Sequence, residues 1–224
     1  MKLLAIDTST RNYNLALAQD QKILLSKNII LQDVLASSMI VEIKKALKKV
    51  KWSFEEIDGY VVGLGPGSFT SLRIGLSTVK GFAFATGKPV IGISSLDAIA
   101  MNVKADKKDI CVITDAKRNM VYGCLYENSN GKPKKKIDYF LSPISELLKR
   151  IKKPTQFSGD GIKLFKEEIL KALPSTQFAS EDDWYPTARN LIILAQGKIK
   201  KQQFDNIAKL IPIYLYPDDC QVQK

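Results

Sequence analysis

The apolar residues of the first half of the chain form short runs that predict strands and longer stripes that predict helices. Leu3 to Ile6 is a continuous apolar run that ends at Asp7, as a buried strand does. Apolar side chains repeating every three or four residues predict a helix over about 33–50 and another over about 70–85. The four further strands expected in this half cover 13–18, 22–30, 60–64 and 90–93. The pattern is that of an α/β protein.

The second half of the chain partly repeats the first. An apolar strand over 110–114 ends at Asp115, as the first strand ends at Asp7, and an alternating strand over 121–126 follows. The two aspartates lie 108 residues apart, about half of the chain, and this self-similarity predicts two related lobes. The other expected elements are an exposed hairpin loop over 128–136, helices over 145–152, 162–173 and 186–197, and an extended tail over 210–217.

The residue types exclude several kinds of chemistry. The 224 residues contain no histidine, so a Ser-His-Asp unit, a Cys-His unit and a metal site with histidine ligands are all absent. A general base would have to be Asp, Glu, Lys or Tyr. Cys111, Cys124 and Cys220 are widely spaced and form no CxxC pair, so we expect reduced cysteines without a disulfide or a thiolate metal site. We expect neither a metal nor a cofactor.

The chain is basic, with a formal net charge of +11. Residues 1–100 hold 12 basic and 8 acidic side chains, and residues 101–224 hold 22 and 15. This surplus suits a protein that works beside RNA, because lysines near phosphates release counterions. It is equally typical of proteins from lysine-rich bacterial proteomes that never bind nucleic acid. No apolar run reaches the roughly 18 residues of a membrane helix, and the first residues reach Asp7 too soon for a secretory signal, so we expect a soluble, cytoplasmic protein.

Two short polar segments are candidates for contact with a nucleotide phosphate. Gly65-Pro66-Gly67-Ser68 lies between a predicted strand and helix, where glycines let the backbone approach a phosphate. Asp7-Thr8-Ser9 combines an acid with hydroxyls, a pattern that holds metal–phosphate pairs, and Asp115 is a candidate counterpart. The alternative is structural, with a tight glycine turn and side chains that cap turns and a helix. The candidate phosphate residues are Asp7, Thr8, Ser9, Gly65, Gly67 and Ser68.

Ser68 is not a candidate nucleophile, because it lacks both the GxSxG elbow and a histidine to activate it.

The two predicted helices of the first half carry small side chains beside their apolar stripes. In the second of these helices, the interior glycines Gly75 and Gly81 each cost about 1 kcal/mol relative to alanine. Ordinary packing within one chain is one explanation. Apolar character on more than one face favours a partner helix pair instead. The candidate interface residues are Leu35, Ser38, Met39, Ile43, Leu72, Ile74, Leu76, Thr78 and Phe82.

Several segments keep a fixed order along nearly the whole chain. They are Leu4-Ala5-Ile6-Asp7-Thr8-Ser9, Gly65-Pro66-Gly67-Ser68-Phe69-Thr70 with Leu72-Arg73-Ile74-Gly75, Asp115-Ala116 with Arg118 and Val121-Tyr122, Gly159-Asp160-Gly161, Pro186-Thr187-Ala188 and Pro212-Ile213-Tyr214-Leu215. In this order they resemble the TsaB (YeaZ) family, whose members are related to the glycoprotease-type TsaD subunit. The chain departs from the family pattern at Ser71, where glycine is usual, and at Lys117 and Tyr216, where arginine is usual.

The resemblance implies an actin-like (ASKHA) fold of two related lobes with mixed sheets flanked by helices. The implied domains are 1–100, with the docking helices, and 101–224. It implies a non-catalytic scaffold within the machinery that transfers threonylcarbamoyl to N6 of adenosine 37 in tRNA. TsaD would be the main partner and TsaE a second, with a homodimer through the same helices as a further arrangement. Contact with tRNA would come through the complex. The alternative from the residues is an ATP-binding actin-fold kinase or nucleotide hydrolase that uses Asp7 and the glycine turn.

Overall fold

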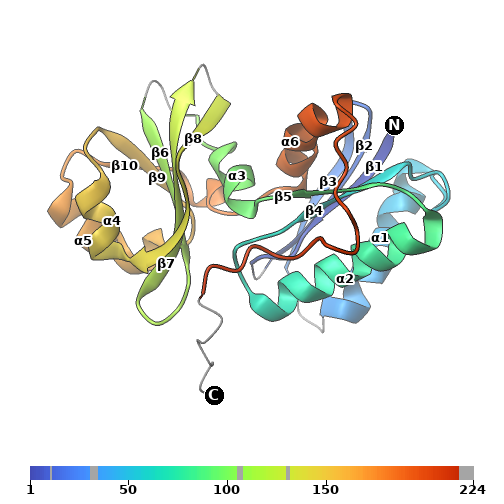
Figure 1. The fold of residues 1–224 in the computed structure, drawn as a ribbon, viewed down its shortest axis with the longest axis horizontal. Coiled ribbons are helices and arrows are strands. Elements are labelled where there is room, and N and C mark those ends of the chain that lie inside the picture. Colours follow the sequence, from blue (N-terminus) through green and yellow to red (C-terminus); the bar gives the residue numbers. More distant parts are fainter. Residues whose placement is uncertain (11, 31–34, 105–107, 130–131, 217–224) are drawn as a thin grey trace. The chain divides into compact units, whose positions relative to one another are not determined.

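The computed structural model describes residues 1–10, 12–30, 35–104, 108–129 and 132–216, while the side chains of 35–37, 129 and 132 lie outside that description. The chain divides into two compact units (Figure 1). Unit 1 comprises Met1–Ala98 with Pro186–Ile213, and unit 2 comprises Ile99–Tyr185 with Tyr214–Lys224. The chain first passes from unit 1 to unit 2 after Ala98, and its last helix belongs to unit 1.

Unit 1 is an α/β layer structure around one five-stranded sheet. Its strands are β1 (Lys2–Asp7), β2 (Asn12–Gln19), β3 (Lys22–Ile30), β4 (Gly59–Gly63) and β5 (Val90–Ile93). Its helices are α1 (Leu35–Val50), α2 (Phe69–Thr86), α3 (Ser95–Ala100), which reaches into unit 2, and α6 (Ala188–Lys200). All five strands and both long helices of the first half were predicted to within two residues at the described ends.

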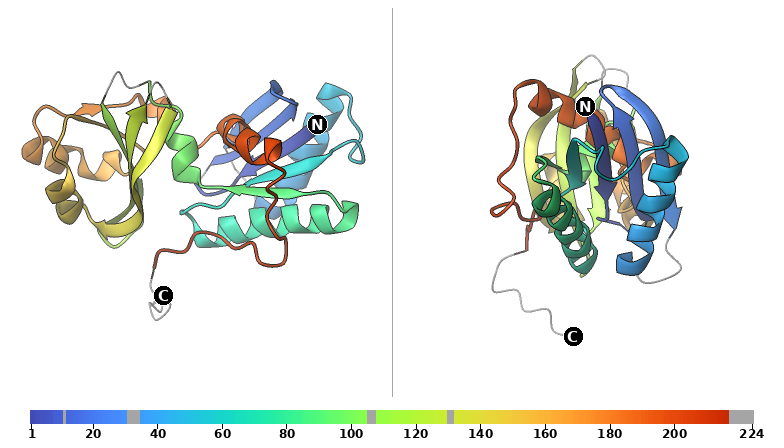
Figure 2. Two further views of the ribbon diagram at one scale, coloured as in Figure 1. Left: turned by 45° about the horizontal axis from the view of Figure 1, so that its top comes forward. Right: turned by 90° about the vertical axis from the view of Figure 1, so that its right-hand side faces the viewer.

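The two faces of the unit 1 sheet are buried by different helices. The strand order is β3-β2-β1-β4-β5, with β1 antiparallel to β2 and parallel to β4. Successive side chains of β1 point to opposite faces. Leu4 and Ile6 pack in the core under α1 and α2, whereas Leu3 and Ala5 pack under α6. Figure 1 and the two views of Figure 2 show these helix layers on either side of the sheet.

Unit 2 has the same plan with shorter helices. Its strands are β6 (Asp109–Asp115), β7 (Met120–Ser129), β8 (Lys132–Pro143), β9 (Thr155–Ser158) and β10 (Gln177–Phe178). Its helices are α4 (Ile144–Arg150), α5 (Ile162–Ala172) and the 3-10 turn η1 (Glu181–Asp183). From the other edge the strand order is β8-β7-β6-β9-β10, which corresponds strand by strand to β3-β2-β1-β4-β5 of unit 1. As β1 does in unit 1, β6 pairs antiparallel with one neighbour, β7, and parallel with the other, β9. The prediction of two related lobes is therefore confirmed in the topology.

The hairpin predicted over 128–136 is confirmed, but its bounds were wrong. β7 runs to Ser129 and pairs antiparallel with β8, which begins at Lys132. β8 is the outer strand of its sheet, and natural edge strands carry lysines because these oppose pairing with other chains. The polar, lysine-rich character of this segment therefore fits an edge strand. The helix predicted at 186–197 is α6, which begins two residues later, after Thr187 accepts the cap hydrogen bond from Asn190 N.

Three expectations concern features outside the two sheets. Cys111 and Cys124 are buried, free thiols, whereas Cys220 lies outside the described residues. The tail from Leu210 to Tyr216 has no regular secondary structure, and Pro217 lies outside the described residues. Across the described part of the chain, no helix has both the length and the apolar character that a bilayer crossing requires.

Candidate functional site

Asp7, at the carboxyl end of β1, is fully buried and is bonded on both carboxylate oxygens by its own chain. Oδ1 accepts hydrogen bonds from Ser9 N at 2.8 Å and from Ser9 Oγ at 2.6 Å. Oδ2 accepts a hydrogen bond from Ser95 Oγ at 2.6 Å. Burial raises the pKa of Asp7, and the bonds from Ser9 and Ser95 oppose that rise. The carboxylate therefore joins the end of β1 to the start of α3.

The glycine turn, Gly65-Pro66-Gly67-Ser68, packs directly against the turn Asp7-Thr8-Ser9, which we call the aspartate turn. A Cβ on Gly67 would stand 2.2 Å from the carbonyl oxygen of Ser9, which also accepts a 2.8 Å hydrogen bond from Ser68 N. A Cβ on Gly75 would stand 2.3 Å from Thr8 Oγ1, because α2 lies against the same turn. Real Cβ contacts of this kind do not occur, so glycine is required at both positions by the chain's own packing.

The predicted phosphate residues thus meet in space, as expected, but they bind one another. Asp7, Thr8 and Ser9 are buried, and the glycines of the turn lie against them. The space that a phosphate would need beside Gly67 is filled by Ser9. Asp115, the predicted counterpart, lies in unit 2, where its N–H donates to Asp160 Oδ1 at 3.1 Å and its carboxylate pairs with Lys117. The contacts favour the structural interpretation of these motifs.

Four of the predicted interface residues lie in the core of unit 1, and this corrects their assignment. Met39 and Ile43 of α1, together with Leu72 and Leu76 of α2, are buried under the sheet. Their three- and four-residue spacing marks the inward face of each helix, which the sequence alone does not distinguish from an outward apolar face. They are therefore core positions, and any docking surface on these helices must be formed by other side chains.

The other predicted interface residues are divided among three settings. Ser38, Ile74 and Thr78 are partly exposed. Phe82 is half-buried against Phe54, with ring centroids 4.8 Å apart in a T-shaped arrangement. The side chain of Leu35 lies outside the described residues.

The burial of Met39 leads to a stability prediction. Met39→Asp would place a carboxylate at a position with 0% exposure, so we expect a loss of at least about 3 kcal/mol in the free energy of unfolding. Val41→Asp, two residues away at a 49% exposed position, should change it by less than about 0.5 kcal/mol. Urea unfolding of both variants measures the contrast. Equal stabilities would contradict the placement of Met39 in the core.

The outward face of α2 carries small and aromatic side chains together with exposed Arg73, whose guanidinium lies over the ring of Phe69. Thr70, Ser77, Gly81 and Phe84 form this row, which we call the α2 stripe. Phe84 is 87% exposed, the largest value among the exposed large apolar residues described. A Cβ on Gly81 would meet nothing within 4 Å, so unit 1 itself does not require glycine there.

The outward face of α1 differs in chemistry. Beyond Val41 it carries Lys44, Lys45, Lys48 and Lys49, all exposed. Among these lysines, Lys45 pairs with Glu42 at 2.7 Å. The apolar, close-packing character that a helix partner needs is therefore concentrated on α2.

The comparisons with known proteins agree with this architecture. A family model described as "TsaD: tRNA N6-adenosine threonylcarbamoyltransferase" matches residues 32–219. The TsaB protein of Buchnera aphidicola subsp. Baizongia pistaciae is 30% identical over 180 residues, covering 77% of this chain and 79% of that protein. The chain belongs to the TsaB (YeaZ) family. The TsaB of Bacillus subtilis is 27% identical over 219 residues, covering 96% of this chain and 94% of that protein.

Solved structures support the fold of this TsaB-family chain. A Pseudomonas aeruginosa protein described as similar to the peptidase YeaZ superposes with a TM-score of 0.81 at 23% identity, covering 96% of this chain and 99% of that one. An activator of 2-hydroxyisocaproyl-CoA dehydratase from Clostridium difficile gives a TM-score of 0.52 at 13% identity. The fold is actin-like, and family membership gives the chain a role in the biosynthesis of threonylcarbamoyladenosine (t6A) in tRNA.

The three departures from the TsaB pattern all have local partners. The carbonyl of Ser71 accepts a 2.8 Å hydrogen bond from Thr8 Oγ1, and its side chain lies 2.9 Å from Ser68 Oγ. Lys117 pairs with Asp115. Tyr216 donates a 2.8 Å hydrogen bond to the Ala116 carbonyl. Each substituted side chain therefore has a structural role of its own in this chain.

Two features of the aspartate turn escaped the sequence interpretation. Ser95 binds Asp7 from 88 residues away, and Gly75 fits against Thr8. The signal for Ser95 is its place directly after β5, where parallel strands bring their carboxyl ends to one edge of the sheet. Within the described residues, no three His, Cys, Asp or Glu side chains are grouped so that they could hold a metal ion.

Proposed function

We propose that this chain is a non-catalytic subunit that binds TsaD and orders it for transfer of threonylcarbamoyl to N6 of adenosine 37 in tRNA. A role in t6A biosynthesis follows from membership of the TsaB family. The proposal adds that the chemistry takes place on TsaD and that this chain contributes a docking surface. The α2 stripe is the observation that supports it.

The stripe has the features of an unpaired helix interface. A glycine inside a helix costs about 1 kcal/mol relative to alanine, and Gly81 brings no packing benefit to unit 1 in return. Small residues let a second helix approach closely, and exposed aromatic side chains contribute much of the binding energy of interfaces. Gly81 and Phe84 are explained together if a helix of another subunit packs over them.

Two observations support the second part of the proposal, that the chemistry takes place on TsaD. The sequence contains no histidine, and Asp7, the candidate acid of unit 1, is buried and bonded to Ser9 and Ser95. An ATP-binding kinase or nucleotide hydrolase would need Asp7 and the glycine turn to face a magnesium–phosphate group. Their mutual packing argues against that alternative.

The same surface accounts for the other expected partners. A second copy of the chain can use the α2 stripe when TsaD is absent, because a two-fold interface needs only one self-complementary patch. TsaE would then join the assembly of TsaD with this chain rather than replace TsaD. In this arrangement tRNA reaches the complex as the substrate of TsaD.

Reconstitution tests the proposal. With TsaD, TsaE, ATP, the threonylcarbamoyl adenylate and unmodified tRNA, we expect t6A formation to require this chain and to fall at least about tenfold with Ile74→Arg, beside the stripe. The chain alone should neither modify tRNA nor hydrolyse ATP. Lys134→Arg, on the exposed part of β8, is the control. Full activity without the chain, or with Ile74→Arg, would contradict the proposal.

A further inference from the structure

One end of unit 1 gathers six lysines from four separate elements, five of them exposed and Lys88 partly exposed. β1, β4 and β5 are parallel neighbours, so their amino ends share one edge of the sheet, and the β2–β3 turn lies there too. We define the lysine edge as Lys22, Lys48, Lys49, Lys88, Lys200 and Lys201.

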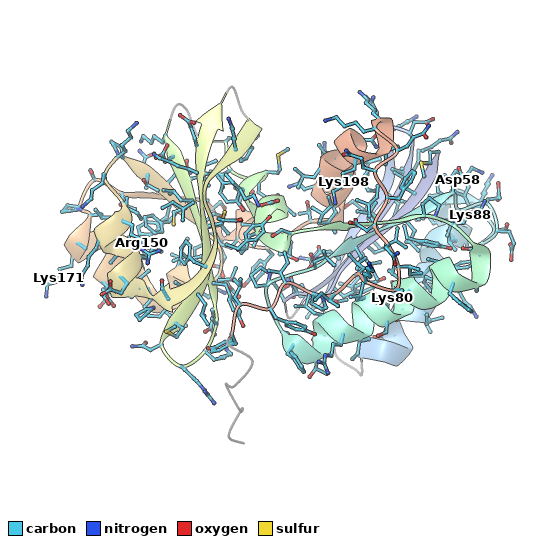
Figure 3. All side chains as sticks on the ribbon, viewed as in Figure 1. Asp58, Lys80, Lys88, Arg150, Lys171 and Lys198 are labelled. Carbon is cyan, nitrogen blue, oxygen red and sulfur yellow. The ribbon has the colours of Figure 1, made fainter. Side chains whose placement is uncertain are left out.

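Contacts between the elements place their ends at this edge. Lys2, at the start of β1, lies over the ring of Trp52, just after α1, at 4.9 Å. Gln196 near the end of α6 donates to the carbonyl of Asp20 in the β2–β3 turn at 2.8 Å. Pro89, after α2, accepts a 3.0 Å hydrogen bond from Tyr60 N in β4. Figure 3 shows Lys88 next to Asp58, which precedes β4, at this end of unit 1.

The acidic side chains of the same region are already bonded within the chain. Asp20 pairs with the terminal amine, and Glu56 pairs with Lys2. Asp58 accepts a 2.7 Å hydrogen bond from the backbone N–H of Lys2. Asp205 accepts one from Gly92 N at 2.8 Å and pairs with Lys198 at 3.3 Å. In the described residues, none of the six edge lysines takes part in a salt bridge.

Helix dipoles account for only part of this charge. The carboxyl ends of α1, α2 and α6 lie at the edge, and lysines near such ends are stabilising in any protein. Each helix end contributes roughly half a negative charge, or about 1.5 for three helices, against six lysines. Unit 1 as a whole holds 17 basic and 9 acidic residues, a net of +8, whereas unit 2 holds 17 and 14, a net of +3.

We infer that the lysine edge binds the phosphate backbone of transfer RNA. The inference rests on the proposed function, which puts tRNA beside this chain as the substrate of the complex. Surplus lysines without acidic partners are suited to a polyanion, since each phosphate contact releases a condensed counterion. The edge lies at the end of the sheet opposite the Asp7 turn, so RNA contact there is independent of the phosphate motifs in the sequence.

The test removes four edge lysines that belong to neither α1 nor α2. Lys22→Gln, Lys88→Gln, Lys200→Gln and Lys201→Gln are combined in one variant, so that the proposed docking helices stay intact. The matched control removes four exposed lysines of unit 2 by Lys134→Gln, Lys152→Gln, Lys153→Gln and Lys171→Gln. Binding of an unmodified tRNA transcript by the assembly with TsaD is measured by fluorescence anisotropy from 50 to 200 mM salt, beside capture of TsaD.

We expect the edge variant to bind tRNA at least about tenfold more weakly at 50 mM salt and to lower the slope of log affinity against log salt by about 3. The control variant should stay within about twofold, and both variants should capture TsaD as the wild type does. Equal losses in the two variants, or no loss in either, would overturn the inference. Unchanged tRNA binding with lost TsaD capture would make the edge a docking surface for an acidic protein. The proposed function is tested separately by Gly81→Leu, a substitution on the α2 stripe that should weaken TsaD binding.

Discussion

Gly81→Leu is expected to abolish capture of TsaD while making the isolated chain slightly more stable. Leucine fits the open space around Gly81 in unit 1, and it is favoured over glycine in a helix by roughly 0.8 kcal/mol. In a helix–helix interface the same side chain would fill the space of the partner's backbone. We expect the dissociation constant for TsaD to rise at least about a hundredfold, or about 2.7 kcal/mol, by calorimetry. Thermal unfolding measures the gain in stability.

Gly197→Leu is the matched control for that experiment. Gly197 lies on the exposed side of α6, and a Cβ there also meets nothing within 4 Å. The helix should gain the same stability, because the change in propensity is the same. TsaD affinity should stay within about twofold. If the two variants lost affinity equally, or if neither did, the α2 stripe would not be the docking surface.

Asp7→Ala is expected to destabilise unit 1 by about 2–4 kcal/mol. The substitution leaves the N–H and hydroxyl of Ser9 and the hydroxyl of Ser95 buried without their acceptor, and each such group costs about 1–3 kcal/mol. Removal of a buried carboxylate offsets part of this loss. Urea unfolding gives the difference. An actin-fold kinase would instead require Asp7 for ATP–magnesium binding, with little effect of the substitution on stability.

Comparison with Asp7→Asn adds a pH dependence of known sign. Burial raises the pKa of Asp7 above its ordinary value of 3.8. Between that value and the folded pKa, the folded state therefore binds the proton more tightly than the unfolded chain does. The stability of the wild type relative to Asp7→Asn should therefore fall as the pH rises from about 3.8 through the folded pKa. A difference that grew with rising pH would contradict a buried carboxyl of raised pKa.

The sequence was sufficient for most of the fold because the strands and long helices are strongly patterned. β3 and β5 were predicted with the bounds that the structure shows, and the Asp7 and Asp115 repeat anticipated the matching strand orders of the two sheets. The return of α6 to unit 1 could not be predicted in this way. Its apolar stripe is buried by Ala16 and Ala18 of β2, a contact that no local pattern specifies.

The candidate site was predictable only in part, for a related reason. Periodicity identifies an apolar stripe but not the side from which it is covered, so Met39, Ile43, Leu72 and Leu76 were assigned to a partner although the sheet buries them. Gly81 could be noted as an unfavourable helix residue, but only the geometry shows that nothing in unit 1 occupies the space beside it. Glycine at position 67 has the opposite explanation, because Ser9 fills its space.

Photo-crosslinking from α2 tests the docking account most directly. The photoreactive amino acid p-benzoylphenylalanine replaces Phe84, the exposed aromatic residue of the α2 stripe, and in a second variant it replaces Ile193, which is exposed on α6. After irradiation of each variant with TsaD, we expect a covalent adduct with TsaD from position 84 and none from position 193. Adducts from position 193 alone, or from neither position in an assembly that still forms, would contradict docking through the α2 stripe.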